Sequence, residues 1–363
     1  MTAPRLQEDV RGWRDREPDV DTAGMRGHIE ALPRHLSDSA AEALETAASI
    51  SVSVPSAIAV VGMGGSAIGG DLVAAYTAER RRTPLVVVRG YELPTWLDDD
   101  AWVIASSYSG NTEETLSAYA AAKERGLRVV AITTGGRLGE QASADGDPVF
   151  SLPGGFPPRA ALGHSFATCA VLTACLATGL EPRAEAEAIA DAGEGLGSIV
   201  DGWLAWEPGN PALIVAAEAV AALPLIYSGH PLSAAAGRRW KTQLNENAKL
   251  LAHTSEFPEH NHNEIVGFEP DRAVPCAIFY LQTAWDHERV RRRMGFVRDY
   301  LDGRAVSQRR VEAGGDTPLE AMLRLCLLGD CASFLASVIT GRDPTPVASI
   351  DALKRQLSSP SRP

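Results

Sequence analysis

Two polar turns, each directly after a predicted buried strand, contain the side chains best suited to hold an anion. The first, GMGGSAIGGD, follows AIAVV and places Gly65 and Ser66 at the start of a predicted helix. The second, SSYSGNTEETL, follows WVIA and supplies Ser107, Ser109 and Thr112. Because hydroxyls and the free N–H groups of a helix start bind phosphate oxygens without a lysine or arginine, we interpret the two turns as one phosphate site. Helix caps and loop serines without a ligand are the alternative for the second turn taken alone.

The first turn also invites comparison with a dinucleotide-binding fingerprint. Gly62, Gly64 and Gly65 match its three spaced glycines loosely. That motif needs an acidic residue at the end of the second strand, whereas this strand ends VVVRGY. A nucleotide cofactor is therefore the weaker interpretation, and a glycine-rich turn without a ligand is the remaining alternative.

The elements that must position these turns alternate between short apolar strands and Ala-rich helices. Continuous apolar strands in such an alternation are typical of a parallel sheet covered on both faces. The plan of strand, Gly/Ser turn and helix recurs at LPLIYSGHPLSAAAGRRWK, which indicates an internal duplication. The predicted fold class is therefore α/β, with two doubly wound parallel-sheet domains. Strands are predicted at 57–61, 85–88, 102–106, 129–133, 149–152, 224–229, 273–281 and 305–313.

We place three parts along the chain: an N-terminal helical segment at 1–40, a first domain at 41–195 and a second domain at 196–363. Ser37 or Ser39 is expected to cap the helix over AAEALETAASI. The Ala/Glu-rich stretch 181–203 is expected to form a helical connector between the domains.

The composition narrows the class of partner. A net charge of -12 argues against nucleic acid, yet one local pocket can still be electropositive and hold a phosphorylated ligand. Five cysteines without a C-x-x-C pair predict buried reduced thiols. The charged N-terminus has no apolar signal region, and no run of about 18 apolar residues predicts a membrane span. We therefore expect a cytoplasmic protein with neither a membrane nor a nucleic-acid partner.

Three further stretches, RRWKTQLNENAK, EFPEHNHNEIVGF and GRDPTPVASIDALK, carry a family resemblance together with the two turns. From about Asp21 to Lys354 the chain resembles the bifunctional phosphoglucose/phosphomannose isomerase family, whose members contain two sugar isomerase (SIS) domains. The resemblance implies two flavodoxin-like αβα domains and a homodimer with a shared active site. It also implies isomerisation of glucose 6-phosphate or mannose 6-phosphate to fructose 6-phosphate, with no metal and no other cofactor.

The resemblance also assigns the reacting groups. Glu246 in LNENAK, at the C-terminal end of a predicted long helix, resembles the base that moves a proton between C1 and C2 through a cis-enediol. His262 resembles the acid/base that opens the sugar ring and reaches the site from the partner subunit. His260 and Glu264 are neighbours with similar chemistry. Arg159 in GFPPRAALG matches an arginine that stabilises the developing enediolate.

The C-terminal tail and one departure from the family complete the expected site. Thr345 in DPTPV and Lys354 in DALK match the tail that closes the site, where the threonine leaves room at C2 for both epimers. Thr340 is the alternative threonine. His164 stands where an apolar or aromatic residue is expected, so it could alter the pocket beside Arg159.

Other classes of function stay open at this stage. A non-catalytic sugar-phosphate sensor of the transcriptional-regulator type would carry a helix-turn-helix and a basic surface, which residues 1–50 do not show. An isomerase for another phosphosugar, including an amino sugar, fits the same motifs. The H-N-H sequence at 260–262 lacks the spaced partners of a zinc site.

Overall fold

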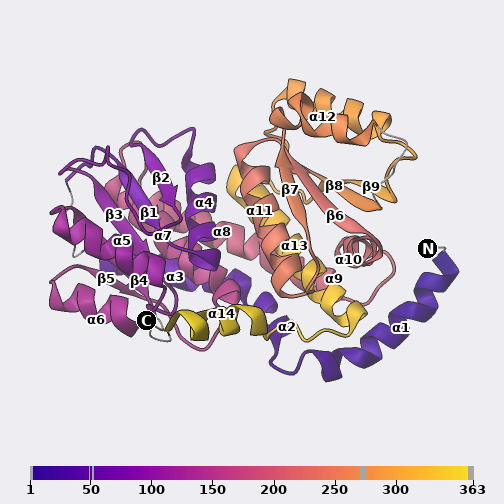
Figure 1. Cartoon of the computed structure of the whole chain (residues 1–363), viewed down its shortest axis with the longest axis horizontal. Helices are drawn as coiled ribbons and strands as arrows, with labels where there is room; N and C mark the ends of the chain where they lie inside the picture. Colours follow the sequence, from indigo (N-terminus) through magenta and orange to yellow (C-terminus); the bar gives the residue numbers. More distant parts are fainter. Residues whose placement is uncertain (1–2, 49, 51–52, 270–274, 359–363) are drawn as a thin grey trace.

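Two parallel β-sheets form the centres of two α/β units, which lie side by side in the computed structural model (Figure 1). The structure describes residues 3–48, 50, 53–269 and 275–358. The two units confirm the predicted pair of doubly wound α/β domains.

The first sheet has five parallel strands in the order β2-β1-β3-β4-β5. This is the flavodoxin-like order, in which the chain reverses direction across the sheet between β1 and β3. A crevice therefore opens at the carboxyl ends of these two strands, where both polar turns begin. The strands are β1 (Ile58–Val61), β2 (Leu85–Val88), β3 (Trp102–Ser106), β4 (Arg128–Thr133) and β5 (Val149–Ser151).

The second sheet has four parallel strands in the order β7-β6-β8-β9. They are β6 (Leu223–Ser228), β7 (His253–Glu256), β8 (Cys276–Gln282) and β9 (Ser307–Glu312). The sequence prediction missed β7, because this edge strand reads HTSE and has no apolar run. The predicted start of β8 at 273 and 274 lies outside the described residues.

Helices cover both faces of each sheet. One face of the first sheet packs on α5 and α6, and the other packs on α3, α4 and α7. That second core continues into α11 and α13 of the second unit, whose opposite sheet face packs on α12. The helices are α1 (Ala3–Val20), α2 (Met25–Glu30), α3 (Leu32–Ala47), α4 (Gly64–Thr77), α5 (Glu113–Glu124), α6 (Gly136–Ala144), α7 (Leu162–Leu176), α8 (Pro182–Gly197), α9 (Val200–Leu204), α10 (Pro211–Ala221), α11 (Pro231–Glu246), α12 (Glu288–Tyr300), α13 (Pro318–Thr340) and α14 (Ala348–Ser358).

The predicted N-cap of α3 at Ser37 or Ser39 is wrong. The helix starts at Leu32, because Pro33 in its first turn favours a helix start and both serines lie in its interior. Residue 40, the predicted end of the N-terminal segment, therefore falls inside α3, which packs against α7 and α8 of the first unit. Residue 195 likewise falls inside α8, and the predicted connector consists of α8 and α9.

Two segments reach the length and hydropathy of a membrane span, contrary to the expectation of no such apolar run. They are Pro158–Leu176 and Pro318–Thr340, and 94% and 89% of their apolar windows are buried inside the protein. Both belong to the shared core, which is the ordinary place for helices that are apolar on all sides.

His164 packs inside the first unit, and none of its described contacts is with Arg159. Its ring stacks on His35 with 4.1 Å between centroids, and its Nδ1 lies 2.7 Å from Ser39 Oγ. Phe156 covers both rings. Burial lowers the pKa of each histidine to about 4. The departure from the family at this position therefore adjusts the packing of α7 on α3.

This histidine pair predicts an acid-sensitive fold. In the unfolded chain both rings take up protons near pH 6.5, whereas the folded pair stays neutral down to about pH 4. Since the unfolded state binds more protons in this window, the free energy of unfolding should fall as the pH is lowered from 6.5 to 4. Urea titrations at pH 7, 5.5 and 4.5 should show a shallower fall for His164→Phe. The control variant His253→Phe, at an exposed ring, should follow wild type. If the free energy of unfolding depends equally on pH in all three proteins, the low pKa of the buried histidine pair is contradicted.

Candidate active site

The two polar turns touch each other at the crevice of the first sheet. A Cβ on Gly62, at the end of β1, would lie 2.9 Å from the Ser106 carbonyl oxygen, so only glycine permits this approach. Ser66, in the first turn of α4, accepts a hydrogen bond at its Oγ from the Tyr108 N–H over 3.2 Å. The structure therefore brings Ser66 against the turn that follows β3.

The second turn presents its own hydroxyls at the start of α5. Ser107 Oγ donates to Thr112 Oγ1 over 2.9 Å, and Thr112 stands at the N-cap position of α5. Ser109 is exposed and its Oγ accepts from the Asn111 N–H at 3.3 Å. Gly110 has a φ of 65° and lies so close to the Gly135 carbonyl that a side chain has no room. This close packing holds the hydroxyls of the turn at the mouth of the crevice.

The first turn also lies directly against the segment that carries Arg159. A Cβ on Gly65 would lie 2.9 Å from the Pro158 carbonyl oxygen and 3.4 Å from Arg159 Cα. The predicted phosphate turn and the predicted arginine, more than ninety residues apart in the sequence, are thus adjacent. Arg159 belongs to the short 3₁₀ helix η1 (Pro158–Ala161).

Arg159 joins the first unit to Glu246 and to the C-terminal tail. Its guanidinium is buried, with Nη1 3.4 Å from Glu246 Oε2 and Nε 2.6 Å from Asn247 Oδ1. Its Nη2 donates to the carbonyls of Pro344 and Thr345, the latter over 3.0 Å. Burial lowers the pKa of Arg159, an effect that the Glu246 carboxylate opposes. The Arg159 guanidinium therefore contacts both the predicted base, Glu246, and the backbone of the predicted tail residue, Thr345.

Glu246 is the last residue of α11, and its side chain is 27% exposed. A partly exposed carboxylate at the rim of the site is free to meet a substrate, while its contact with Arg159 sets its direction. A carboxylate that removes a proton and a cation that stabilises the resulting oxyanion are the two groups that an enediol mechanism requires.

A buried network behind these residues holds them in place. Arg239 Nη2 donates to the Arg159 carbonyl over 3.1 Å and to Asp330 Oδ2 over 2.6 Å. Asn247 Nδ2 donates to Ser333 Oγ over 2.9 Å. Arg239 and Asp330 are almost fully buried, and breaking a buried pair of this kind typically costs about 3–5 kcal/mol. The backbone of Arg159 is therefore tied to α11 and α13.

Sequence reasoning missed Lys249 as a site residue. Its φ of 56° is the only positive value among the described non-glycine residues. The unusual turn directs Nζ to the carbonyls of Glu246 and Pro344, at 2.7 Å and 3.1 Å. Burial, and then the nearby Arg159, lower the pKa of Lys249 to about 8. The sequence feature that could have indicated Lys249 as a site residue is its position in NENAK, three residues after Glu246.

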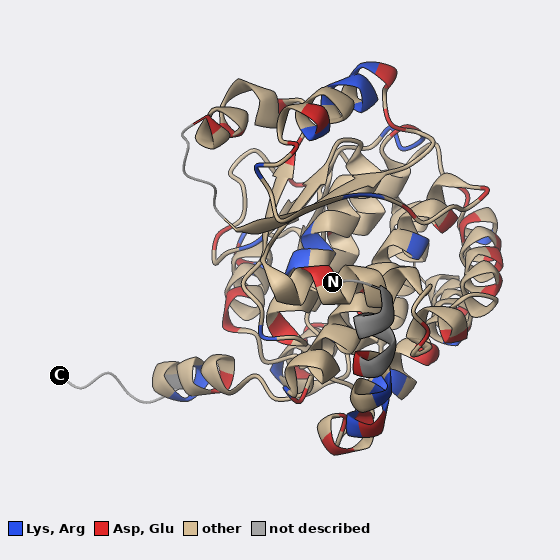
Figure 2. Ribbon diagram, turned by 90° about the vertical axis from the view of Figure 1, so that its right-hand side faces the viewer, with Lys and Arg blue, Asp and Glu red and all other residues tan. Residues whose placement is uncertain are grey.

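The two predicted tail residues have different surroundings. Thr345 lies beside Arg159, and its Oγ1 is buried without a hydrogen-bond partner in the part of the chain that the structure describes. Thr340, the alternative, bonds back to carbonyls within α13. Lys354 is exposed on α14, which projects from the body of the protein in Figure 2. The structure of one chain therefore brings Thr345, but not Lys354, to the Arg159 cluster.

His262 is exposed at the end of the 3₁₀ helix η2 (Glu259–His262), which precedes η3 (Glu264–Phe268). Within the described residues, nothing hydrogen-bonds to its ring. Both neighbours are engaged inside the second unit: His260 stacks on Phe257 at 4.6 Å, and Glu264 accepts from the Tyr227 hydroxyl at 2.7 Å. Burial lowers the pKa of His260. Of these three groups, His262 is exposed, whereas His260 is buried and Glu264 is held by Tyr227.

Comparisons with known proteins identify the family to which the chain belongs. Residues 52–145 match the SIS domain model, and residues 209–357 match the model described as bacterial phospho-glucose isomerase C-terminal SIS domain. A bifunctional phosphoglucose/phosphomannose isomerase from Caldicellulosiruptor bescii is 38% identical over 328 residues, covering 87% of this chain and 95% of that protein. The chain belongs to the bifunctional phosphoglucose/phosphomannose isomerase family. A relative of the same name from Aquifex aeolicus is 32% identical and covers 83% of this chain and 90% of its own length.

Solved structures with low sequence identity share the fold of this isomerase family member. The C-terminal domain of glucosamine-fructose-6-phosphate aminotransferase from Francisella tularensis aligns with a TM-score of 0.67 at 15% identity, covering 88% of this chain and 96% of that one. Tagatose-6-phosphate ketose/aldose isomerase from Escherichia coli aligns with a TM-score of 0.64 at 16% identity, covering 90% and 95%. These likenesses support a tandem of two SIS domains.

The side chains of the described residues also speak to the two cofactor types considered from the sequence, a metal ion and a dinucleotide. Within the described ranges, no group of three or more His, Cys, Asp or Glu side chains is placed to hold a metal ion. After β2, where a dinucleotide-binding fold has an acidic residue, Arg89 stands instead and pairs with Asp71 of α4.

Proposed function

We propose that this isomerase family member converts glucose 6-phosphate and mannose 6-phosphate to fructose 6-phosphate. The observation that carries the proposal is the position of Arg159, which contacts Glu246 and lies directly against Gly65 of the phosphate turn. A phosphate cradle, a base and a cation are then within reach of one small phosphosugar.

The cradle would hold the phosphate through neutral donors only. Hydroxyls of both turns and the N–H groups at the starts of α4 and α5 converge on the crevice between β1 and β3. Helix starts of this kind attract anions through their free N–H groups and their dipoles. The residues of the proposed cradle are Gly65, Ser66, Ser107, Ser109 and Thr112.

The proton transfer would use Glu246 as the only shuttle. Its carboxylate removes the proton from C2 of the open-chain aldose, the C2–H electron pair forms the C1=C2 bond and the carbonyl pair moves to O1, which gives a cis-enediolate. The same carboxyl then returns the proton to C1 while the proton of the C2 hydroxyl passes to O1, so that C2 becomes the carbonyl of the ketose. Arg159 stabilises the negative charge on the enediolate oxygen, and Thr345 leaves space at C2 for either epimer.

Ring opening is assigned to His262 of a second copy in a homodimer with a shared site. The exposed ring of His262 supports this, because it has no described partner of its own. The projecting helix α14 supports it too, since Ile350, Leu353 and Leu357 are exposed and spaced for one helix face. We assign Lys354, on the same helix, to closure of the site in that dimer. The proposal includes the organisation predicted from the sequence, with an N-terminal helical segment and two SIS domains, and a location in the cytoplasm.

An isomerase or epimerase for an amino-sugar phosphate is the second candidate, and one comparison favours it. A D-glucosamine-6-phosphate 4-epimerase from Sulfolobus acidocaldarius is 33% identical over 215 residues, which is 57% of this chain and 62% of that protein. The longer match to the named phosphoglucose/phosphomannose isomerases makes the hexose 6-phosphates the better proposal.

A coupled assay for fructose 6-phosphate tests the proposal. Glucose 6-phosphate and mannose 6-phosphate should both yield fructose 6-phosphate, and chelator should leave both rates unchanged. A parallel sample with glucosamine 6-phosphate, analysed for any isomer, tests the second candidate. Activity with neither hexose phosphate would refute the proposed function, and inactivation by chelator would refute the metal-free mechanism.

A further inference from the structure

A basic region on the second unit stands out against the acidic chain. Residues 288–312, covering α12 and β9, contain eight arginines and four carboxylates, a net charge of +4, whereas the whole chain carries -12. Helix α12, which carries five of these arginines, lies on the outer side of the second unit in Figures 1 and 2. The proposed isomerase reaction uses no side chain of this region, although Arg293 of α12 contacts Asn261, next to His262.

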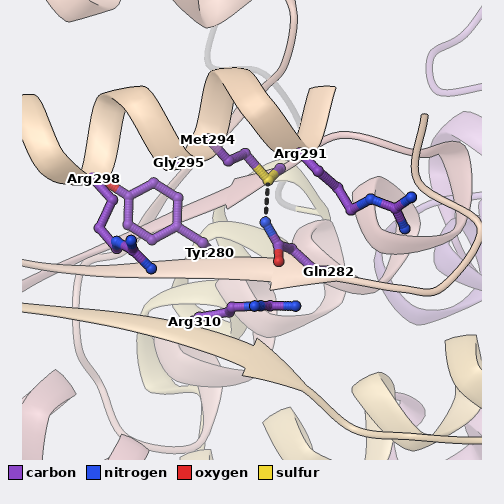
Figure 3. A pocket seen from close by; sticks show the side chains of 7 residues that line it. All are labelled: Tyr280, Gln282, Arg291, Met294, Gly295, Arg298 and Arg310. Carbon is purple, nitrogen blue, oxygen red and sulfur yellow. Dashed lines mark hydrogen bonds between the residues drawn. The ribbon is translucent and has the colours of Figure 1, made fainter. Parts of the chain in front are cut away.

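Part of this region encloses a cavity of about 250 Å³ between α12 and the sheet. Figure 3 shows Tyr280 and Gln282 of β8 between Arg291 and Arg298 of α12 and Arg310 of β9. Tyr280 and Arg310 are register partners in the parallel β8–β9 pair, so their side chains share one face of the sheet. Three arginines therefore line one small cavity, which we call the arginine pocket, and the guanidinium of Arg291 points away from the other two in Figure 3.

The existing partners of these arginines leave the pocket open to an anion. Arg298 pairs with the exposed Asp299 at 3.0 Å, and Arg310 pairs with the exposed Glu312. Exposed pairs of this type contribute little and are easily exchanged. Within the described ranges, Arg291 donates only through Nη1, to the Ala284 carbonyl over 3.2 Å. Each guanidinium has five N–H donors, so several remain available.

Gln282 gives an independent indication that this pocket can take a polar ligand. Gln282 is 7% exposed and lines the cavity, yet among the described residues its Nε2 donates only to the sulfur of Met294, over 3.0 Å. Thioether sulfur is a weak acceptor, and buried amides normally find an oxygen partner. A ligand oxygen in the arginine pocket would supply one.

The pocket is separate from the Arg159 and Glu246 cluster of its own chain. Tyr280 and Gln282 face α12, whereas the alternating residues Phe279 and Leu281 face the core with α11 and α13. Glu246 stands at the end of α11, on that other side of the sheet. A ligand in the arginine pocket would therefore not compete directly with the sugar at Arg159 and Glu246.

We propose that the arginine pocket is a second anion site, which binds the phosphate group of a small phosphorylated ligand. Planar guanidinium groups match the oxygens of phosphate in pairs, and the neutral Gln282 amide adds one further donor. The volume suits a ligand smaller than the ones that occupy typical drug-sized pockets.

Titration calorimetry with inorganic pyrophosphate on the full-length protein tests this site. The measurements use a Ser107→Ala/Ser109→Ala background, which weakens binding at the proposed substrate cradle. Adding Arg298→Gln and Arg310→Gln should weaken the remaining binding by about tenfold or more, because two charge-assisted contacts are lost. The control pair, Arg289→Gln and Arg292→Gln, removes the same charge from α12 outside the pocket lining and should change the affinity much less.

Two outcomes would overturn the proposal. One is an unchanged affinity for pyrophosphate in the pocket variant; if its oligomeric state also changes, a second copy occupies the pocket instead. The other is an equal loss of affinity in the control, which would indicate general surface charge. Isomerase turnover of Arg298→Gln/Arg310→Gln in an otherwise wild-type chain should remain normal, so failure here is distinct from failure of the proposed function.

Discussion

Glu246→Gln is expected to lower the turnover number for fructose 6-phosphate formation by about 10³-fold, with a much smaller change in KM. Glutamine has nearly the same shape and keeps an oxygen near Arg159 Nη1, but its amide cannot accept the C2 proton. Substrate binding should survive, since the phosphate cradle and Arg159 are untouched. Loss of kcat without loss of affinity is the signature of a group that acts in the transition state.

Steady-state kinetics and deuterium exchange at C2 in heavy water provide the measurement. The variant should lose exchange in parallel with turnover, because both need the same proton removal. Glu42→Gln, at an exposed position on α3, provides a matched control and should behave as wild type. A Glu246→Gln protein with wild-type turnover, or with exchange intact and only product formation lost, would contradict the base assignment.

The sequence predicted the local parts of this protein well, because their signals lie within a few residues. Apolar strands followed by small polar turns gave the first sheet and the two turns at its crevice. The missed strand β7 shows the limit of this approach: His253 to Glu256 has no apolar pattern, and only its pairing with β6 makes it a strand. Pairing partners distant in sequence cannot be deduced from periodicity.

The contacts between the site residues could not be predicted from sequence patterns for the same reason. The contact of Arg159 with Glu246, and of both with the Thr345 segment, depends on how α11, η1 and the tail pack together. Sequence resemblance named these residues without explaining why they meet. The structure adds Lys249, whose positive φ turns it back onto the Glu246 carbonyl. A left-handed lysine has no composition signal, because nothing in its side chain favours that conformation.

The same network suggests why Arg159 is so strongly positioned. Its backbone carbonyl is held by Arg239, which is in turn paired with buried Asp330. A guanidinium that must stabilise charge at one oxygen gains from being held in place before the substrate arrives. The network joins η1 of the first unit to α11 and α13 of the second, so the relative position of the two units and the geometry of the site depend on each other.

Restoration of activity from two inactive variants is the second large effect we expect. His262→Ala should lower turnover on ring-closed sugar phosphates by about 10²–10⁴-fold, the range for loss of a general acid or base. If His262 serves the Glu246 of the partner subunit, a mixed dimer of His262→Ala and Glu246→Gln chains has one site with both defects and one with neither. Random exchange of equal amounts should therefore restore about a quarter of wild-type activity, since about half of the dimers are mixed.

Subunit exchange can be followed by mixing tagged chains and purifying the mixed dimer before the assay. Glu246→Gln mixed with a chain that carries both substitutions provides the control, because neither site of that dimer is intact. If His262 instead acts within its own chain, every site in the first mixture keeps one defect and the mixture stays inactive. The exposed ring of His262 and the close grouping of Arg159 and Glu246 within one chain favour restoration. No regained activity after verified exchange would contradict the shared site and leave His262 without the role proposed for it.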